Sequence, residues 1–83
     1  TKYFLTNCIV SATTDINYSI KLWKTIGKIY SFLNARAASV WSLHKMVSHL
    51  GFTHHGGASN YNHFPWVVLD PYFKVLCEGV TLN

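Results

Sequence analysis

The 83 residues suffice for a single domain, residues 1–83, with one modest core, and they exclude a second domain. The chain is 49% hydrophobic and only 12% charged, about half the charged share of soluble domains, so we expect its apolar excess to be covered by a partner subunit or by self-association. Seven Lys and Arg residues against three Asp and Glu residues give a net charge of +4, which favours an anionic partner such as a membrane or a cell-wall polymer.

The chain begins without Met and without a recognisable signal peptide, so we expect it to be processed. The first predicted element, residues 2–10 (KYFLTNCIV), is rich in aromatic and β-branched residues and precedes the turn-forming segment SATTD, which predicts a strand. Strict alternation places Phe4 and Cys8 on one face and Tyr3 on the other. Because both faces are largely apolar, we expect this strand to be central in its sheet or covered, and buried on both sides.

A helix is predicted over residues 16–34, with Thr14 or Asp15 as its N-cap. Its apolar residues form two rows at helical spacing, the first being Ile16, Ile20, Trp23, Gly27 and Tyr30 and the second Leu22, Ile26, Ile29 and Leu33. The other residues form one polar stripe that contains every lysine of the segment: Asn17, Lys21, Lys24, Lys28 and Ser31. These lysines exclude a membrane-spanning helix, which needs roughly 18 uninterrupted apolar residues.

The three lysines of this stripe, Lys21, Lys24 and Lys28, are the candidate binding face of the protein. A helix with a wide apolar face and a row of lysines is typical of segments that lie in a membrane interface. The same pattern is typical of a surface helix that packs on a sheet and turns its lysines to water, and this second interpretation is the commoner one.

A second helix is predicted for the segment SVWSLHKMVSHLG, with Ser39 as its N-cap and Gly51 ending it in a left-handed turn. The core stripe of this helix consists of Val40, Leu43, Val47 and Leu50. Trp23 and Trp41 each lie one position from a core row. We therefore expect both indoles to be packed between the helices and the sheet, where truncation is costly.

The C-terminal part predicts a polar loop followed by two strands. The loop covers residues 53–63 (THHGGASNYNH), and the strands cover about 66–69 and 72–82, separated by a turn at Asp70-Pro71. In the last strand Phe73, Val75 and Cys77 share a face. The order strand, helix, helix, strand, strand predicts an α+β fold, with a small antiparallel or mixed sheet and two helices packed on one face.

The two cysteines, Cys8 and Cys77, both fall in predicted strands. If the first and last strands are neighbours, the two sulfurs meet across the sheet and form a disulfide, which stabilises a loop of this length by roughly 4 kcal/mol. A bridge indicates secretion or an organelle lumen, whereas two buried free thiols indicate an intracellular chain.

The histidines are the only candidates for chemistry, and the sequence supports them weakly. His49, His54, His55 and His63 are weak candidates for a metal site, because none of the usual zinc spacings is present and no carboxylate is near them in sequence. No nucleophile elbow, phosphate-binding loop or carboxylate pair is recognisable, so we expect neither a cofactor nor an enzyme.

These features favour a small secreted cationic binding or toxin-like protein that acts on an anionic cell surface or membrane, together with a partner chain. In general character such a chain is similar to subunits of killer toxins and of other antimicrobial proteins, although no motif carries the similarity. Nucleic acid is a weaker expectation, because Arg36 is the only arginine. The alternative is a small structural subunit of a larger intracellular or organellar complex.

Overall fold

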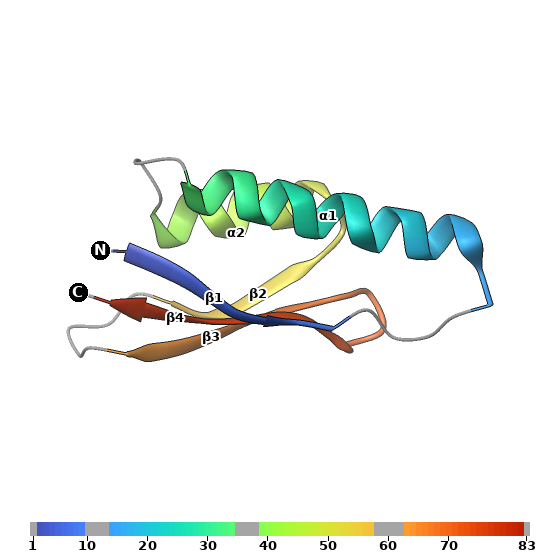
Figure 1. Cartoon of the computed structure of the whole chain (residues 1–83). Coiled ribbons are helices and arrows are strands. Elements are labelled where there is room, and N and C mark those ends of the chain that lie inside the picture. The colour runs from blue at the N-terminus through green and yellow to red at the C-terminus, as the bar shows by residue number, and fades with distance from the viewer. Residues whose placement is uncertain (1, 10–13, 35–38, 58–62, 83) are drawn as a thin grey trace.

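Two helices cover one face of a four-stranded sheet in the computed structural model, which describes residues 2–9, 14–34, 39–57 and 63–82 (Figure 1). All neighbouring strands are antiparallel, and their order is β1-β4-β3-β2. This confirms the α+β class and the two helices on one face. The elements in chain order are β1 (Lys2–Cys8), α1 (Ile16–Asn34), α2 (Val40–His49), β2 (Thr53–Gly56), β3 (Phe64–Leu69) and β4 (Val75–Leu82).

The extra strand, β2, lies where the sequence predicts the start of a polar loop, so that part of the prediction is wrong. Residues 53–56 pair with residues 66–69 of β3, and His54 is turned into the protein with 6% of its surface exposed. The two histidines and the glycine of this segment resemble a loop by composition, but pairing satisfies their backbone groups. Residues 58–62 of the predicted loop lie outside the described residues.

The first strand is an edge strand with one exposed face, which contradicts the expectation of a central or covered strand buried on both sides. Its one neighbour among the described strands is β4, and Lys2 at the start of β1 pairs with Leu82 at the end of β4 (Figure 1). Tyr3 faces the helices and is buried, whereas Phe4 on the opposite face is 45% exposed. Within the described parts of the chain, both helices lie on Tyr3's side of the sheet, so the second apolar face of β1 remains open.

Trp66 occupies the centre of the sheet on the face that the helices cover, with 1% of its surface exposed. Its two cross-strand partners are glycines, Gly56 on β2 and Gly79 on β4. A Cβ atom added to Gly79 would lie 2.1 Å from Cζ2 of Trp66, so the indole takes the space that a side chain would need. Tyr3 and His54 extend the row on both sides, with ring centroids 6.3 and 5.7 Å from that of Trp66.

Both helices begin at the caps that the sequence predicts. The backbone N–H of Tyr18 donates to Oδ1 of Asp15 at 3.2 Å, and that of Ser42 donates to Oγ of Ser39 at 3.1 Å. Gly51 follows α2 with a φ of 86°, the left-handed conformation that glycine adopts at low cost.

The buried stripes of the helices are narrow. The second apolar row of α1 packs on the sheet through Leu22, Ile26 and Ile29, and Leu43 and Val47 of α2 are fully buried. These residues form one core cluster with Trp66. Partly buried side chains such as Leu33 on α1 and Met46 on α2 pack against this cluster.

Asp70 fixes the start of α1 to the turn between β3 and β4. Its Oδ2 accepts a hydrogen bond from the Tyr18 hydroxyl at 2.7 Å, and its Oδ1 accepts from the backbone N–H groups of Tyr72 and Lys74 at 2.9 Å each. Burial would raise the pKa of Asp70, but these hydrogen bonds outweigh burial and lower it. Burial and the hydrogen bond to Asp70 raise the pKa of Tyr18 to about 12.

The segment after Asp70 corrects a smaller prediction. Phe73, expected on the last strand beside Val75 and Cys77, lies instead in the turn before β4 and is largely exposed. Its φ of 62° is left-handed and costs a non-glycine residue roughly 1 kcal/mol. The hydrogen bonds that Asp70 accepts from both neighbours of Phe73 hold the turn in this conformation.

The Gly79→Ala substitution tests the packing of Trp66. The new methyl group would overlap the indole ring, so we expect a loss of about 2 to 3 kcal/mol in the free energy of unfolding, measured by urea denaturation. Gly27→Ala is the matched control, because nothing lies within 4 Å of a Cβ at this helical position. It should stabilise the protein by about 0.5 to 1 kcal/mol. Unchanged stability of Gly79→Ala would show that the indole does not lie on this glycine.

Candidate functional site

The first apolar row of α1 lies at the surface, where its members form a ridge. The four side chains of this row are between 47% and 74% exposed, and Trp23 is 61% exposed. The prediction that Trp23 is packed between helix and sheet is therefore wrong. Among the described residues, the sheet packs mainly on the arc of α1 that carries the second row, so the first row stays largely exposed. We call Ile16, Ile20, Trp23, Gly27 and Tyr30 the apolar ridge.

Trp41 on α2 is also exposed, by 66%, so its predicted burial is wrong as well. Its ring lies under the ammonium group of Lys45, whose Nζ is 4.1 Å from the ring centroid. Among the three tryptophans, only Trp66 belongs to the core. One sequence signal distinguishes it: Trp66 stands in the apolar run FPWVVL, whereas Trp23 and Trp41 have polar neighbours.

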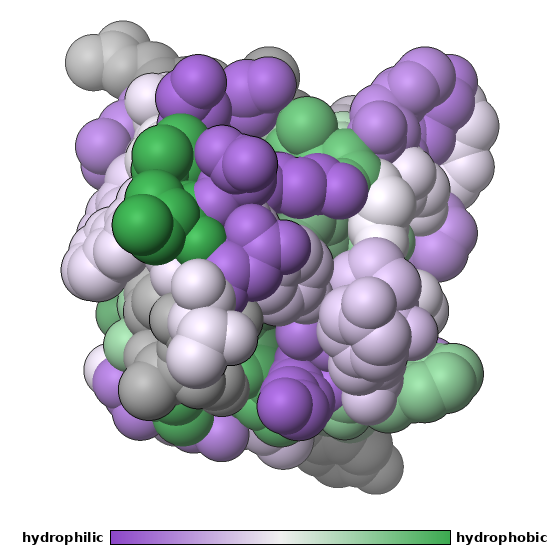
Figure 2. Space-filling view, turned by 90° about the vertical axis from the view of Figure 1, so that its right-hand side faces the viewer, coloured by the Kyte–Doolittle hydropathy of each residue, from purple (hydrophilic) through white to green (hydrophobic). Residues whose placement is uncertain are grey.

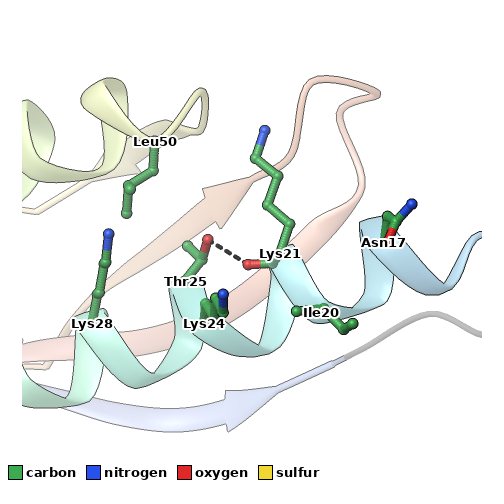
Figure 3. A pocket seen from close by; sticks show the side chains of 7 residues that line it. All are labelled: Asn17, Ile20, Lys21, Lys24, Thr25, Lys28 and Leu50. Atoms are coloured by element: carbon green, nitrogen blue, oxygen red, sulfur yellow. Dashed lines mark hydrogen bonds between the residues drawn. The ribbon is translucent and has the colours of Figure 1, made fainter.

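The three predicted lysines lie together on the side of α1 next to the apolar ridge. Lys21, Lys24 and Lys28 are all exposed and line one open hollow of about 290 Å³ between α1 and the end of α2. Figure 3 shows Lys21 and Lys28 extending from α1 on the side where Leu50, the residue that follows α2, lies. The remaining lining residues are Asn17, Ile20 and Thr25, so no acidic side chain borders the hollow. We call the three lysines the lysine face.

Lys21 differs from the other two because it also contacts the second helix. Its Nζ lies 5.9 Å from the ring centroid of Phe52, just beyond the C-terminal end of α2. A positive charge at this end of a helix is favourable. Lys21 therefore contributes to the joint between the helices, whereas Lys24 and Lys28 present their charge to solvent.

The apolar ridge and the lysine face share one helix and meet at Ile20, which belongs to the ridge and lines the hollow. Figure 2 views the end of the molecule at which α1 begins, and there green apolar patches border directly on purple hydrophilic ones. Among the described residues, no helix combines the length and apolar character needed to cross a membrane. The exposed side of α1 therefore has an apolar row and a row of lysines next to each other.

The two cysteines lie directly opposite each other on β1 and β4, as expected for neighbouring first and last strands. Their Sγ atoms are 3.1 Å apart and both thiols are free, so the predicted disulfide stays a prediction. The register shift between Leu5 and Asn7 brings Cys8 to the face of Cys77, whereas strict alternation would place it with Phe4. Burial raises the pKa of Cys77, and the neighbouring Cys8 thiol raises it further. Cys8 also raises the pKa of Tyr30, at the end of the apolar ridge.

The histidines do not come together. His54 is buried against Trp66 with no hydrogen-bond partner for its Nε2, and burial, helped by His44 and His55, lowers its pKa to about 4. His55 and His63 are exposed, and His49 lies with His44 along a hollow on α2. Among the described residues, no three His, Cys, Asp or Glu side chains are placed to share a metal ion.

The geometry of the cysteine pair predicts that a mild oxidant such as oxidised glutathione closes the bridge. The N–H of Ile9 donates to the carbonyl of Leu76 at 2.8 Å, which makes Cys8 and Cys77 a non-hydrogen-bonded pair with closely spaced side chains. Intact mass spectrometry should show the loss of two hydrogens and no thiol left to alkylate. Two alkylated cysteines after oxidation of the folded protein would contradict the prediction.

Comparisons with protein-family models, curated protein sequences and solved structures return no significant match. The lysine face, the apolar ridge and the cysteine pair are the features of the structure that bear on its function.

Proposed function

We propose that this protein is a small cationic binding protein that attaches to an anionic surface through the lysine face of α1. One observation carries the proposal: three exposed lysines line a single hollow in which no lining residue is acidic. Each lysine close to an anionic surface contributes about 1 kcal/mol of attraction. A surface or polymer that carries carboxylate, phosphate or sulfate groups and lies over the hollow would meet positive charge from all three lysines.

The distribution of the acids supports the same proposal. Asp15 caps α1, Asp70 is buried under three hydrogen bonds, and Glu78 lies on β4, on the face of the sheet away from the helices. None of the three carboxylates lines the hollow beside the lysine face, so the charge of its lysines is available to a partner. Secretion and a toxin-like action on a cell surface belong to this proposal and depend on oxidation of Cys8 and Cys77.

A second candidate function, a subunit of a larger assembly, is favoured by the open face of the sheet. Phe4 is 45% exposed there, and the other apolar residues of that face are only half-buried: Val67, Leu69, Val80 and Leu82. Such a surface is suited to contact with another chain. Two free thiols in the protein isolated from its natural source would favour this candidate, whereas a bridge would favour a secreted binding protein.

Replacing Lys21, Lys24 and Lys28 together with Gln tests the proposal. We expect only a small loss of stability, because exposed charges contribute little, Gln is a good helix former, and only the contact of Lys21 with Phe52 is removed. Binding to polyphosphate and to anionic vesicles at low salt should weaken by roughly 100-fold, because about 3 kcal/mol of attraction is lost. Binding of the unaltered protein should also weaken as salt is raised.

The matched control replaces Lys2, Lys45 and Lys74 with Gln, which removes the same charge from exposed positions outside the lysine face. This control should retain most of the binding. Equal weakening in both triple variants would assign binding to net charge alone. Full binding by the lysine-face variant would overturn the proposal.

A further inference from the structure

We infer that the partner of α1 is the surface of an anionic lipid bilayer, with the apolar ridge inserted into the lipid interface and the lysine face on the head groups. The inference rests on the proposed function and names its partner. The apolar ridge has no part in the proposed function, since soluble polyanions would bind the lysines without contacting the ridge.

The ridge is an exposed apolar row whose members lie outside the core cluster, and only Tyr30, at its end, interacts with the described part of the sheet, through Cys8. Ile16 and Tyr30 mark its ends and are separated by about 21 Å along the helix. The core row of α1 lies on another side of the helix and contains the residues that hold it to the sheet. The ridge side chains are instead about half exposed or more, which costs solvation free energy unless a partner covers them.

The composition of the ridge fits a lipid interface. Trp23 and Tyr30 combine an apolar ring with a polar group, and such side chains concentrate where acyl chains meet head groups. Ile16 and Ile20 supply purely apolar surface. A helix lying in the interface buries its apolar side by about 5 to 10 Å, a depth that these side chains can reach without moving the sheet.

The lysines beside the ridge favour lipid over a second copy of this chain as the partner of the ridge. Two copies packed ridge to ridge would bring two lysine faces close together, and α1 contains no acidic residue between Ile16 and Asn34 to pair with them. Like charges brought together in this way oppose association. Anionic head groups offer negative charge beside an apolar layer, so they complement both surfaces at once.

The test compares variants of the ridge with an equally exposed tryptophan elsewhere. Trp23→Ser and, separately, Ile16→Ser shorten the ridge without touching the hollow, and Trp41→Ser on α2 is the matched control. Binding is measured by co-sedimentation with vesicles of phosphatidylglycerol and phosphatidylcholine, and by titration with polyphosphate. Circular dichroism checks that each variant is folded.

Both ridge variants should bind the vesicles about tenfold more weakly and polyphosphate as well as the unaltered protein does, whereas Trp41→Ser should match the unaltered protein in both assays. Vesicle binding that is unchanged in Trp23→Ser and Ile16→Ser would overturn the lipid inference and leave the proposed function standing. A dimer in sedimentation equilibrium that both ridge variants dissociate would assign the ridge to a second copy and also overturn it. Failure of the proposed function has a different signature, the undiminished binding of the lysine-face variant to both partners.

Discussion

The packing of Trp66 between two glycines is the constraint on which the rest of the molecule depends. Its cross-strand partners Gly56 and Gly79 have no side chains, and the indole lies over Gly79, where it creates an apolar platform on the face that the helices cover. Both helices settle on this platform, and each buries only the stripe that meets it. The surfaces left outside, namely the apolar ridge, the lysine face and the open face of the sheet, are therefore consequences of where the indole lies.

The parts of the fold that depend on local chemistry could be predicted from the sequence. Asp15 and Ser39 begin their helices and Gly51 follows the end of α2, as capping chemistry requires. The lysines lie on one side of α1 because the spacing of a helix alone decides which residues share a side. Which of two equally regular apolar rows faces the sheet depends on tertiary packing, so the exposure of Trp23 could not be predicted. The bulge that turns Cys8 toward Cys77 and the pairing of residues 53–56 likewise arise from neighbouring strands, which spacing along one strand does not reveal.

Contacts at several points hold α1 in place, so its exposed side is formed before any partner binds. Tyr18 ties the start of the helix to Asp70, Lys21 reaches Phe52 beyond the end of α2, and Ile29 is fully buried further along. An amphipathic peptide that folds only on a membrane loses conformational entropy when it binds. Here the lysines and the ridge are already in place, so attraction to an anionic surface is not offset by the cost of forming the helix.

Quenching of tryptophan fluorescence by lipids with brominated acyl chains tests the central claim, that the ridge side of α1 enters the bilayer. Trp41→Phe leaves Trp23 as the exposed tryptophan, and Trp23→Phe leaves Trp41, with comparable exposure and with the buried Trp66 as a common background. In anionic vesicles the account predicts strong quenching when Trp23 is present and little when only Trp41 remains. Equal quenching of the two variants, or none in either, would contradict it.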